Sequence, residues 1–428
     1  MTCFTRIGLR RWHTRVIALG AVALAVNACG RQEPPAKAQA SPPPPLARFD
    51  ADLEFLRGHT KVVVLADAAH GAQVVVAPEY QGRVMTSTTG GPDAPSFGWI
   101  GRAAIGSGQR QPHMNVFGGE DRFWLGPEGG QYALFFKHGD PFDLDHWQTP
   151  EPIDWGAWDI VNQSPSAVGF HKRMTLQNYA GTDLDVDVNR TVRLMADAEI
   201  ATQLKVPLTA AVRAVGFEST NAVTNAGKRP WQQASGLISV WILGMFNPSP
   251  QTTIVLPVAQ SNESTSGPVV NDAYFGKVPR DRLIVGDGMV FFRGDGQYRS
   301  KIGVPPSRAL SIAGSYDAAA HVLTLIEYTR PAHALGYVNS MWAIQRDPYS
   351  GDVINSYNDG PPAPGKPPLG PFYELETSSP ALDLAPGAAY VHVHRTFHLA
   401  GSETDLDPIA RATLHVGLAE VTKAFPTR

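Results

Sequence analysis

The chain has 428 residues, of which 43% are hydrophobic and 18% are charged, with a formal net charge of −3 at pH 7. This balance is typical of a folded protein, and the lack of a basic excess argues against nucleic acid and anionic lipid as partners. Both cysteines, Cys3 and Cys29, lie near the N-terminus. The remainder of the chain therefore has no thiol for a disulfide, for thiolate catalysis or for cysteine-ligated zinc.

Residues 1–28 predict an export signal that is removed. Four arginines and no acidic residue come first, and the run from Val16 to Val26 then contains only apolar residues and glycine. That run is shorter than the ~20 apolar residues that cross a bilayer. The segment Val26-Asn27-Ala28-Cys29 resembles the lipobox of bacterial lipoproteins, and this resemblance implies a lipid on Cys29. The alternative is an ordinary signal peptide followed by a chance cysteine.

Residues 29–48 predict a tether, because they are rich in Pro, Ala and Gln and contain little that could be buried. Loss of the signal removes four arginines and lowers the formal net charge from −3 to −7. Several acyl chains on Cys29 would anchor the protein stably, and the anchor is the expected contact with a membrane. The glycine after Cys29 favours the outer membrane over the inner one, with the folded part facing the periplasm.

Residues 49–428 show no second linker and no short repeat, so we expect one large domain. Residues 50–56 predict a short helix, and the stretch 206–215 is ambiguous. Strand patterns, which alternate or run apolar between Gly, Pro, Asn and Asp, are the main signal. The clearest ones span residues 61–66, 71–77, 184–194 and 322–328. Abundant Gly and Pro disfavour long helices, so the sequence predicts an all-β fold with large antiparallel sheets, as a sandwich or barrel.

The first candidate site lies in residues 113–130, where two glycine pairs flank a short strand. Tight turns on both sides would bring Glu120, Asp121, Arg122 and Trp124 close to a ligand. Carboxylates, a guanidinium and an indole together suit a sugar ring, which needs hydrogen bonds to its hydroxyls and a flat surface for stacking. A salt-bridged turn packed by a core tryptophan explains the pattern equally well.

The second candidate site comprises two glutamates and a nearby turn. In an extended strand Glu374 and Glu376 point to one face, and neighbouring carboxylates raise one another's pKa toward the range where they act as acid or base. Two solvated glutamates on an exposed face are the alternative. Asp359 lies in the turn sequence 357–360, which local backbone needs could also explain.

The third candidate site is a row of three histidines. His392, His394 and His398 share one face of a predicted strand, and neutral imidazole suits zinc. Strand ligands two residues apart need further ligands from elsewhere, so we favour hydrogen-bonding residues of a groove over a metal site. We expect neither a metal nor a cofactor.

Other chemistries lack support in the sequence. No GxSxG nucleophile elbow, no P-loop and no GxGxxG after a strand occur, which argues against serine hydrolases and nucleotide-binding proteins. The segment that contains Trp147, Trp155 and Trp158 among aspartates is open to two interpretations. It either rims a sugar-binding cleft or covers a sheet.

Two C-terminal motifs resemble the galactose mutarotase (aldose 1-epimerase) superfamily. They are Leu375-Glu376-Thr377 and the stretch from Leu384 to His392, which are similar to the family's Leu-Glu-Thr strand and its following turn and strand. This resemblance implies a β-supersandwich with a concave carbohydrate site, and it places Glu376 at the catalytic base. The segment from Gly119 to Gly130 is similar to the family's glycine-rich site segment. The whole chain looks like an uncharacterised family of bacterial lipoproteins with this fold.

One departure from the superfamily concerns its catalytic histidine. The family places it in a Thr-Asn-His segment, and the nearest match here is Thr224-Asn225-Ala226. We therefore expect Glu376 to act as base, Glu374 to tune it and His113 to supply the acid. The sequence predicts that a carbohydrate or oligosaccharide is held by Glu120, Asp121, Arg122, Trp124, Asp359 and His394. An epimerase, a lyase and a hydrolase all fit, and the rival is a carbohydrate-binding or scaffold protein without turnover.

Overall fold

The computed structural model describes residues 47–67, 71–90, 95–260, 267–286, 288–332 and 336–425. The predicted signal, Cys29 and all but the end of the predicted tether lie outside the described residues. Within the described ranges, no helix is both long and apolar enough to span a membrane.

The largest sheet has ten strands in the order β11-β12-β10-β14-β15-β18-β8-β7-β6-β5, and all its neighbouring strands are antiparallel. Its strands are β5 (Asp159–Gln163), β6 (Ala167–Gln177), β7 (Asp183–Met195), β8 (Arg213–Asn225), β10 (Thr252–Pro257), β11 (Leu283–Val285), β12 (Met289–Arg293), β14 (Ile312–Asp317), β15 (Val322–Tyr328) and β18 (Ala389–Ala400).

A five-stranded antiparallel sheet has the order β13-β16-β17-β9-β4. Its strands are β13 (Ser300–Val304), β16 (Ile354–Asn358), β17 (Tyr373–Ser378), β9 (Ser239–Phe246) and β4 (Arg122–Gly126). A third sheet of three strands comprises β1 (Val63–Ala66), β2 (Gln73–Ala77) and β3 (Arg83–Thr88).

The core lies between the ten-stranded and five-stranded sheets. Leu375 of β17 and Ile302 of β13 belong to the same buried cluster as Ile254 of β10 and Ile326 of β15. Full burial of each such side chain stabilises the fold by roughly 1.5–3 kcal/mol. Because successive side chains of a strand point to opposite faces, the residues between these apolar positions lie on the outer face of the five-stranded sheet.

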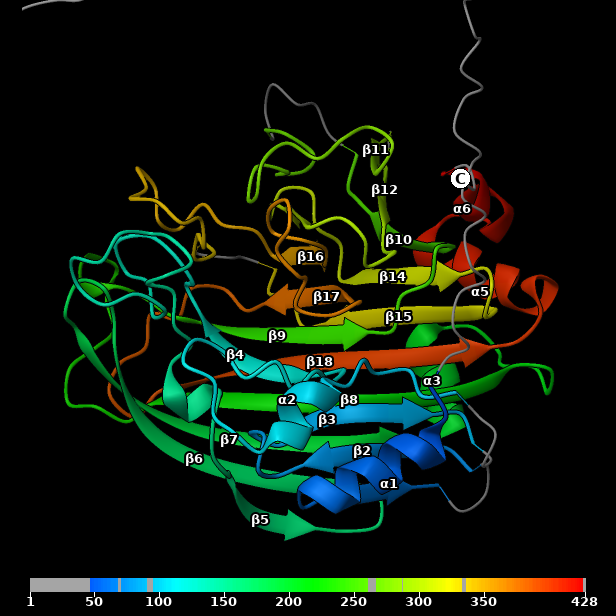
Figure 1. Cartoon of the computed structure of the whole chain (residues 1–428), viewed down its shortest axis with the longest axis horizontal. Coiled ribbons are helices and arrows are strands. Elements are labelled where there is room, and N and C mark those ends of the chain that lie inside the picture. The colour runs from blue at the N-terminus through cyan, green and yellow to red at the C-terminus, as the bar shows by residue number, and fades with distance from the viewer. Residues whose placement is uncertain are drawn as a thin grey trace, which may run out of the picture. The chain divides into compact units, whose positions relative to one another are not determined.

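Helices pack against strands of the three-stranded and ten-stranded sheets (Figure 1). The helices are α1 (Phe49–His59), α2 (Arg102–Ser107), α3 (Asp197–Leu204), α5 (Glu403–Leu414) and α6 (Leu418–Lys423), with 3-10 turns η1 (Glu151–Ile153) and η2 (Gln233–Ser235). Leu406 and Ile409 of α5 share a buried cluster with Leu323 of β15 and Leu399 of β18. These two C-terminal helices, α5 and α6, thus cover the face of the ten-stranded sheet that points away from the five-stranded sheet.

The predicted fold class is confirmed, because large antiparallel sheets dominate the described residues. The helix at 50–56 is confirmed as α1, and the four strand patterns correspond to β1, β2, β7 and β15. The ambiguous stretch 206–215 resolves into a connection that leads into β8 at Arg213.

Candidate functional site

Charged and aromatic side chains lie together on the outer face of the five-stranded sheet. Strand register sets Trp124 of β4 opposite Trp241 of β9, and their rings meet edge to face with centroids 5.5 Å apart. Further along the sheet, Lys301 of β13 lies opposite Tyr357 of β16, which lies opposite Glu374 of β17. These residues share one face because each occupies the outward position of its strand.

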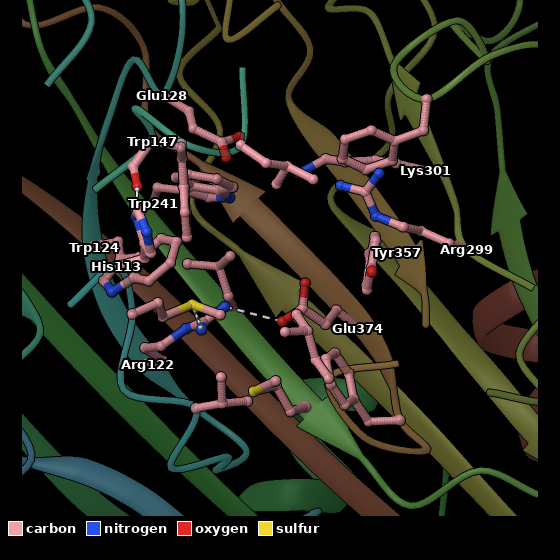
Figure 2. Close-up of a pocket in the computed structure, with 18 of the residues that line it drawn as sticks. His113, Arg122, Trp124, Glu128, Trp147, Trp241, Arg299, Lys301, Tyr357 and Glu374 are labelled. Carbon is pink, nitrogen blue, oxygen red and sulfur yellow. Dashed lines mark hydrogen bonds and ion pairs between the residues drawn. The ribbon is translucent and has the colours of Figure 1, made fainter. Parts of the chain in front are cut away.

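This face forms the floor of a cavity of about 260 Å³. Figure 2 shows Trp124, Trp147 and Trp241 on one side of it, with Arg299, Lys301 and Tyr357 on the other. Lining side chains from strands and loops are His113, Met114, Val116, Arg122, Trp124, Glu128, Leu144, Trp147, Trp241, Leu243, Met245, Phe275, Arg299, Lys301, Trp342, Tyr357, Leu369, Phe372 and Glu374.

Loops from distant parts of the sequence close the cavity over the sheet. The Nδ1 atom of His113 lies 2.6 Å from the carbonyl oxygen of Trp147. Because a carbonyl can only accept, Nδ1 carries a proton and donates to it. Trp342 stacks on Trp147 with ring centroids 6.1 Å apart. The loop residues thus fix one another, and Trp147 and Trp342 both line the cavity.

A buried ion pair crosses the cavity floor. Arg122 donates from Nη2 to Oε1 of Glu374 at 2.9 Å, and its guanidinium lies over the Trp124 ring, 4.0 Å from the centroid. Burial, partly opposed by Arg122, raises the pKa of Glu374 from 4.5 to about 8. Glu374 can therefore exist as both acid and carboxylate near neutral pH, as acid–base catalysis requires.

A second ion pair lies beside the first. Lys301 Nζ and Trp241 Nε1 each donate to Oε2 of Glu376 at 2.9 Å. Burial opposes the charge of Lys301, but Glu376, Glu128 and Glu374 outweigh it and raise the pKa of the lysine. Glu376 is fully buried and does not line the cavity. It acts on the cavity through the positions of Lys301 and Trp241.

Glu128 supplies a second carboxyl group to the cavity. It follows β4, and its backbone N–H donates to Ser340 Oγ at 3.1 Å. Burial raises the pKa of Glu128, and the nearby Lys301 opposes that effect. The cavity therefore contains two carboxyl groups, Glu128 and Glu374, whose pKa values are both shifted toward neutrality.

The raised pKa of Glu374 predicts a pH-dependent stability. A group that binds its proton more tightly in the folded chain contributes stability that is complete below its unfolded pKa and is lost as pH rises through its folded pKa. For Glu374 this loss of stability spans the pH range from 4.5 to about 8. Between pH 5 and 8 the unfolding free energy of the wild type should fall more steeply than that of Glu374→Gln, measured by urea denaturation. Parallel curves for the two proteins would contradict the assignment.

Two of the predicted sugar-binding residues, Glu120 and Asp121, lie behind the sheet rather than in the cavity. Glu120 accepts from the Ser87 backbone N–H at 2.6 Å and contacts His398 Nε2 at 2.9 Å. Asp121 pairs with the fully buried Arg190 at 2.6 Å. The prediction that they contact a ligand in this cavity is therefore corrected, because both are fully buried and bonded to the protein. Positive φ angles at Gly118 and Gly119 turn the chain just before them.

The histidine row also lies between the sheets. Thr377 Oγ1 contacts His392 Nε2 at 3.1 Å and His394 Nδ1 at 2.9 Å, whereas His398 pairs with Glu120. Burial lowers the pKa of His392 to about 3 and that of His394 to about 4, so both rings are neutral. No group of three or more ligand-type side chains in the described ranges is arranged to hold a metal ion. His394 is fully buried outside the cavity, so its predicted sugar contact is corrected too.

Asp359 stands directly behind the cavity wall. It is fully buried, accepts from Tyr357 Oη at 2.9 Å and from the Gly370 backbone N–H at 2.8 Å, and thereby fixes a tyrosine that lines the cavity.

Among the tryptophans that the sequence left open, Trp147 lines the cavity and Trp158 belongs to the core. Trp155 lines a separate cleft beside α1 and α2.

The structure brings together four of the predicted residues, His113, Arg122, Trp124 and Glu374, and it adds others that sequence reasoning missed. The additions with chemistry to offer are Glu128, Trp241, Arg299, Lys301, Trp342 and Tyr357. Lys301, beside Ile302 in the short strand Ser300–Val304, was a usable signal, since a buried lysine needs a partner. The tryptophans gave no such signal, because tryptophan also fills cores.

Several solved structures are similar to the chain. A proposed aldose 1-epimerase from Escherichia coli K12 is 12% identical, with a TM-score of 0.46, and the match covers 80% of this chain and 99% of that one. A galactose mutarotase-like protein from Lactobacillus casei is 12% identical, with a TM-score of 0.45 and coverage of 79% and 100%. A galactose mutarotase related enzyme from Lactobacillus acidophilus is 9% identical, with a TM-score of 0.42 and coverage of 80% and 97%.

No curated protein matches the chain. A family model does, and it spans residues 47–425, which is nearly all of the chain outside the predicted signal and tether. The chain therefore belongs to the family of unknown function DUF6786.

Proposed function

We propose that this protein is an exported, lipid-anchored enzyme that performs acid–base chemistry on a carbohydrate bound in the cavity. The observation that carries the proposal is the combination of tryptophan walls with two carboxyl groups, Glu128 and Glu374, in one cavity. Lipid on Cys29 and a tether over residues 29–48 would hold the enzyme at the outer membrane, facing the periplasm.

The walls of the cavity suit a sugar. Indole faces stack against the C–H surface of a pyranose, and polar groups at the edge of the rings bind its hydroxyls. The buried Nε1 of Trp124 and Nε of Arg122 have no hydrogen-bond partner among the described residues. Both donors are enclosed by the protein, and burial without a partner costs free energy.

We assign the base to Glu374 and the acid to Glu128. The carboxylate of Glu374 takes the proton of the anomeric hydroxyl while Glu128 protonates the ring oxygen, so that the C1–O5 bond breaks and an open-chain aldehyde forms. Closure on the other face of the aldehyde reverses both proton transfers and gives the other anomer. The resemblance of Leu375-Glu376-Thr377 to mutarotases favours this reaction, with the base moved by two residues because Glu376 is enclosed by Lys301 and Trp241.

His113 has a supporting role in this proposal. With Nδ1 donating to the Trp147 carbonyl, Nε2 is the ring nitrogen that remains for a ligand in the cavity. We assign to it the binding of a sugar hydroxyl.

A sugar panel tests the proposal. Binding is measured by calorimetry and anomer interconversion by NMR exchange for the wild type, Trp342→Ala and Trp155→Ala. Loss of one stacking surface should weaken binding about three- to tenfold in Trp342→Ala. Trp155→Ala is the matched control, since this tryptophan is also half-buried but lines the separate cleft. Failure of every sugar to bind, or equal weakening in both variants, would overturn the proposal.

A second candidate function is carbohydrate binding without turnover. It is favoured by the two ion pairs, since Arg122 and Lys301 neutralise both glutamates of β17 and give them a structural role. In that case sugars bind with the same dependence on Trp342, and the wild type neither interconverts anomers nor releases a product from any glycan.

A further inference from the structure

One cation in the cavity differs from the others in its bonding. Arg122 is paired with Glu374 and Lys301 with Glu376. Arg299 lines the same cavity, two residues before Lys301, and has no hydrogen bond or ion pair with any residue that the structure describes. Its guanidinium lies over the Phe275 ring, 3.7 Å from the centroid. Stacking on Phe275 fixes the plane of the guanidinium and leaves its N–H groups available.

We propose that the carbohydrate carries an anionic group, a carboxylate or a sulfate or phosphate ester, and that Arg299 binds this group. The inference rests on the proposed carbohydrate site and names its substrate class. A planar guanidinium donates two parallel hydrogen bonds to such an oxyanion. The other two cationic side chains that line the cavity, Arg122 and Lys301, are already paired with glutamates.

The electrostatics of the cavity support an anionic ligand. Three cationic side chains line it, and two of them are paired, Arg122 with Glu374 and Lys301 with Glu376. The charge of Arg299 is thus the one without an ion pair among the described residues. Burial raises the pKa of Glu128, and it raises that of Glu374 to about 8, which reduces the negative charge of Glu374 near neutral pH. Behind the wall, Arg299 acts electrostatically on Asp359, whose two carboxylate oxygens accept from Tyr357 Oη and the Gly370 N–H.

Position in the cavity also fits the role. Figure 2 shows Arg299 across the cavity from Trp124 and Trp147 and on the same side as Tyr357 and Lys301. A sugar ring stacked on the tryptophans would extend its substituents toward this side. The anionic group would thus bind at the wall opposite the tryptophans.

Calorimetry with matched sugar pairs tests the inference. Glucuronate is compared with glucose, galacturonate with galactose, and glucose 6-sulfate and glucose 6-phosphate are added to show which oxyanion is preferred. The wild type should bind at least one anionic sugar about tenfold or more tightly than its neutral counterpart. Arg299→Gln should remove that preference and change affinity for the neutral sugar less than twofold. Arg299→Lys should keep only part of it, because a lysine lacks the planar fork.

Arg57→Gln is the control for a general change in charge, since Arg57 is an exposed arginine of α1 outside the cavity. It should keep the full preference for the anionic sugar. Neutral sugars that bind as tightly as every anionic one, or a preference that survives Arg299→Gln, would overturn the inference while leaving the proposed carbohydrate function intact. Failure of all sugars to bind would overturn both.

Discussion

Glu374→Gln should lower kcat/KM for the sugar by about 10²- to 10⁴-fold, the range that a positioned acid or base contributes. Glutamine keeps the shape of the side chain and can still contact Arg122, but its amide cannot exchange a proton. Binding of the sugar should change much less than turnover, since the tryptophan walls remain. The measurement is anomer interconversion by NMR exchange, with affinity measured separately by calorimetry.

Glu376→Gln is the informative comparison for this experiment. Glu376 is fully buried and bonded to Lys301 and Trp241, so its amide variant should act indirectly and retain far more turnover than Glu374→Gln. The opposite ranking, with turnover abolished only in Glu376→Gln, would assign the base as the mutarotase resemblance implies. Glu54→Gln, on the exposed face of α1, controls for loss of a carboxylate elsewhere.

The largest expected loss of stability is that of Lys301→Met, about 3–5 kcal/mol in the free energy of unfolding. Lys301 and Glu376 form an ion pair in which the side chains are 7% and 0% exposed. Methionine fills similar space but leaves the carboxylate of Glu376 buried without its cation. Urea denaturation at pH 7 measures the change directly.

Two further variants isolate the cause of that loss. Lys301→Met combined with Glu376→Gln should regain most of the stability, because no charge is then left unpaired. Lys277→Met removes a lysine whose distance to Asp272, 2.7 Å, is slightly shorter than the 2.9 Å of the buried pair, but whose side chain is 83% exposed. That variant should lose no more than about 1 kcal/mol. Equal losses in Lys277→Met and Lys301→Met would show that burial of the pair is not decisive.

Strand alternation made much of the fold predictable. The pattern at 184–194 corresponds to β7, because half-buried antiparallel strands alternate apolar and polar residues. The mostly apolar run at 322–328 coincides with β15, which is almost fully buried. The C-terminal helices escaped prediction. In α5 the buried residues Leu406, Ile409, Ala410, Thr413 and Leu414 do follow helical spacing. Pro408 lies in the middle of α5, and helix propensity alone would therefore predict that no helix forms there.

Alternation also predicted part of the candidate site. Glu374 and Glu376 do point to one face of β17, and Arg122 and Trp124 share the corresponding face of β4. Alternation places side chains only within a strand. Glu120 lies between the glycines that turn the chain and the start of β4, and its side chain contacts Ser87 and His398 instead of the cavity.

The remaining site residues depend on which strands become neighbours. Lys301 reaches Glu376 only because β13, β16 and β17 lie side by side, and Trp241 reaches it because β9 borders β17. A strand pattern shows which residues share a face within one strand, but it does not show the order of strands in a sheet. Long-range pairing therefore decided which side chains meet.

A crystal structure of the wild-type protein with a bound sugar tests the central claim most directly. We expect the sugar ring on the outer face of the five-stranded sheet, stacked on the tryptophans, with its anomeric hydroxyl within hydrogen-bond distance of Glu374 and its anionic group at Arg299. A sugar bound in the cleft beside Trp155, or one in the cavity that leaves both Glu128 and Glu374 out of contact, would contradict the account.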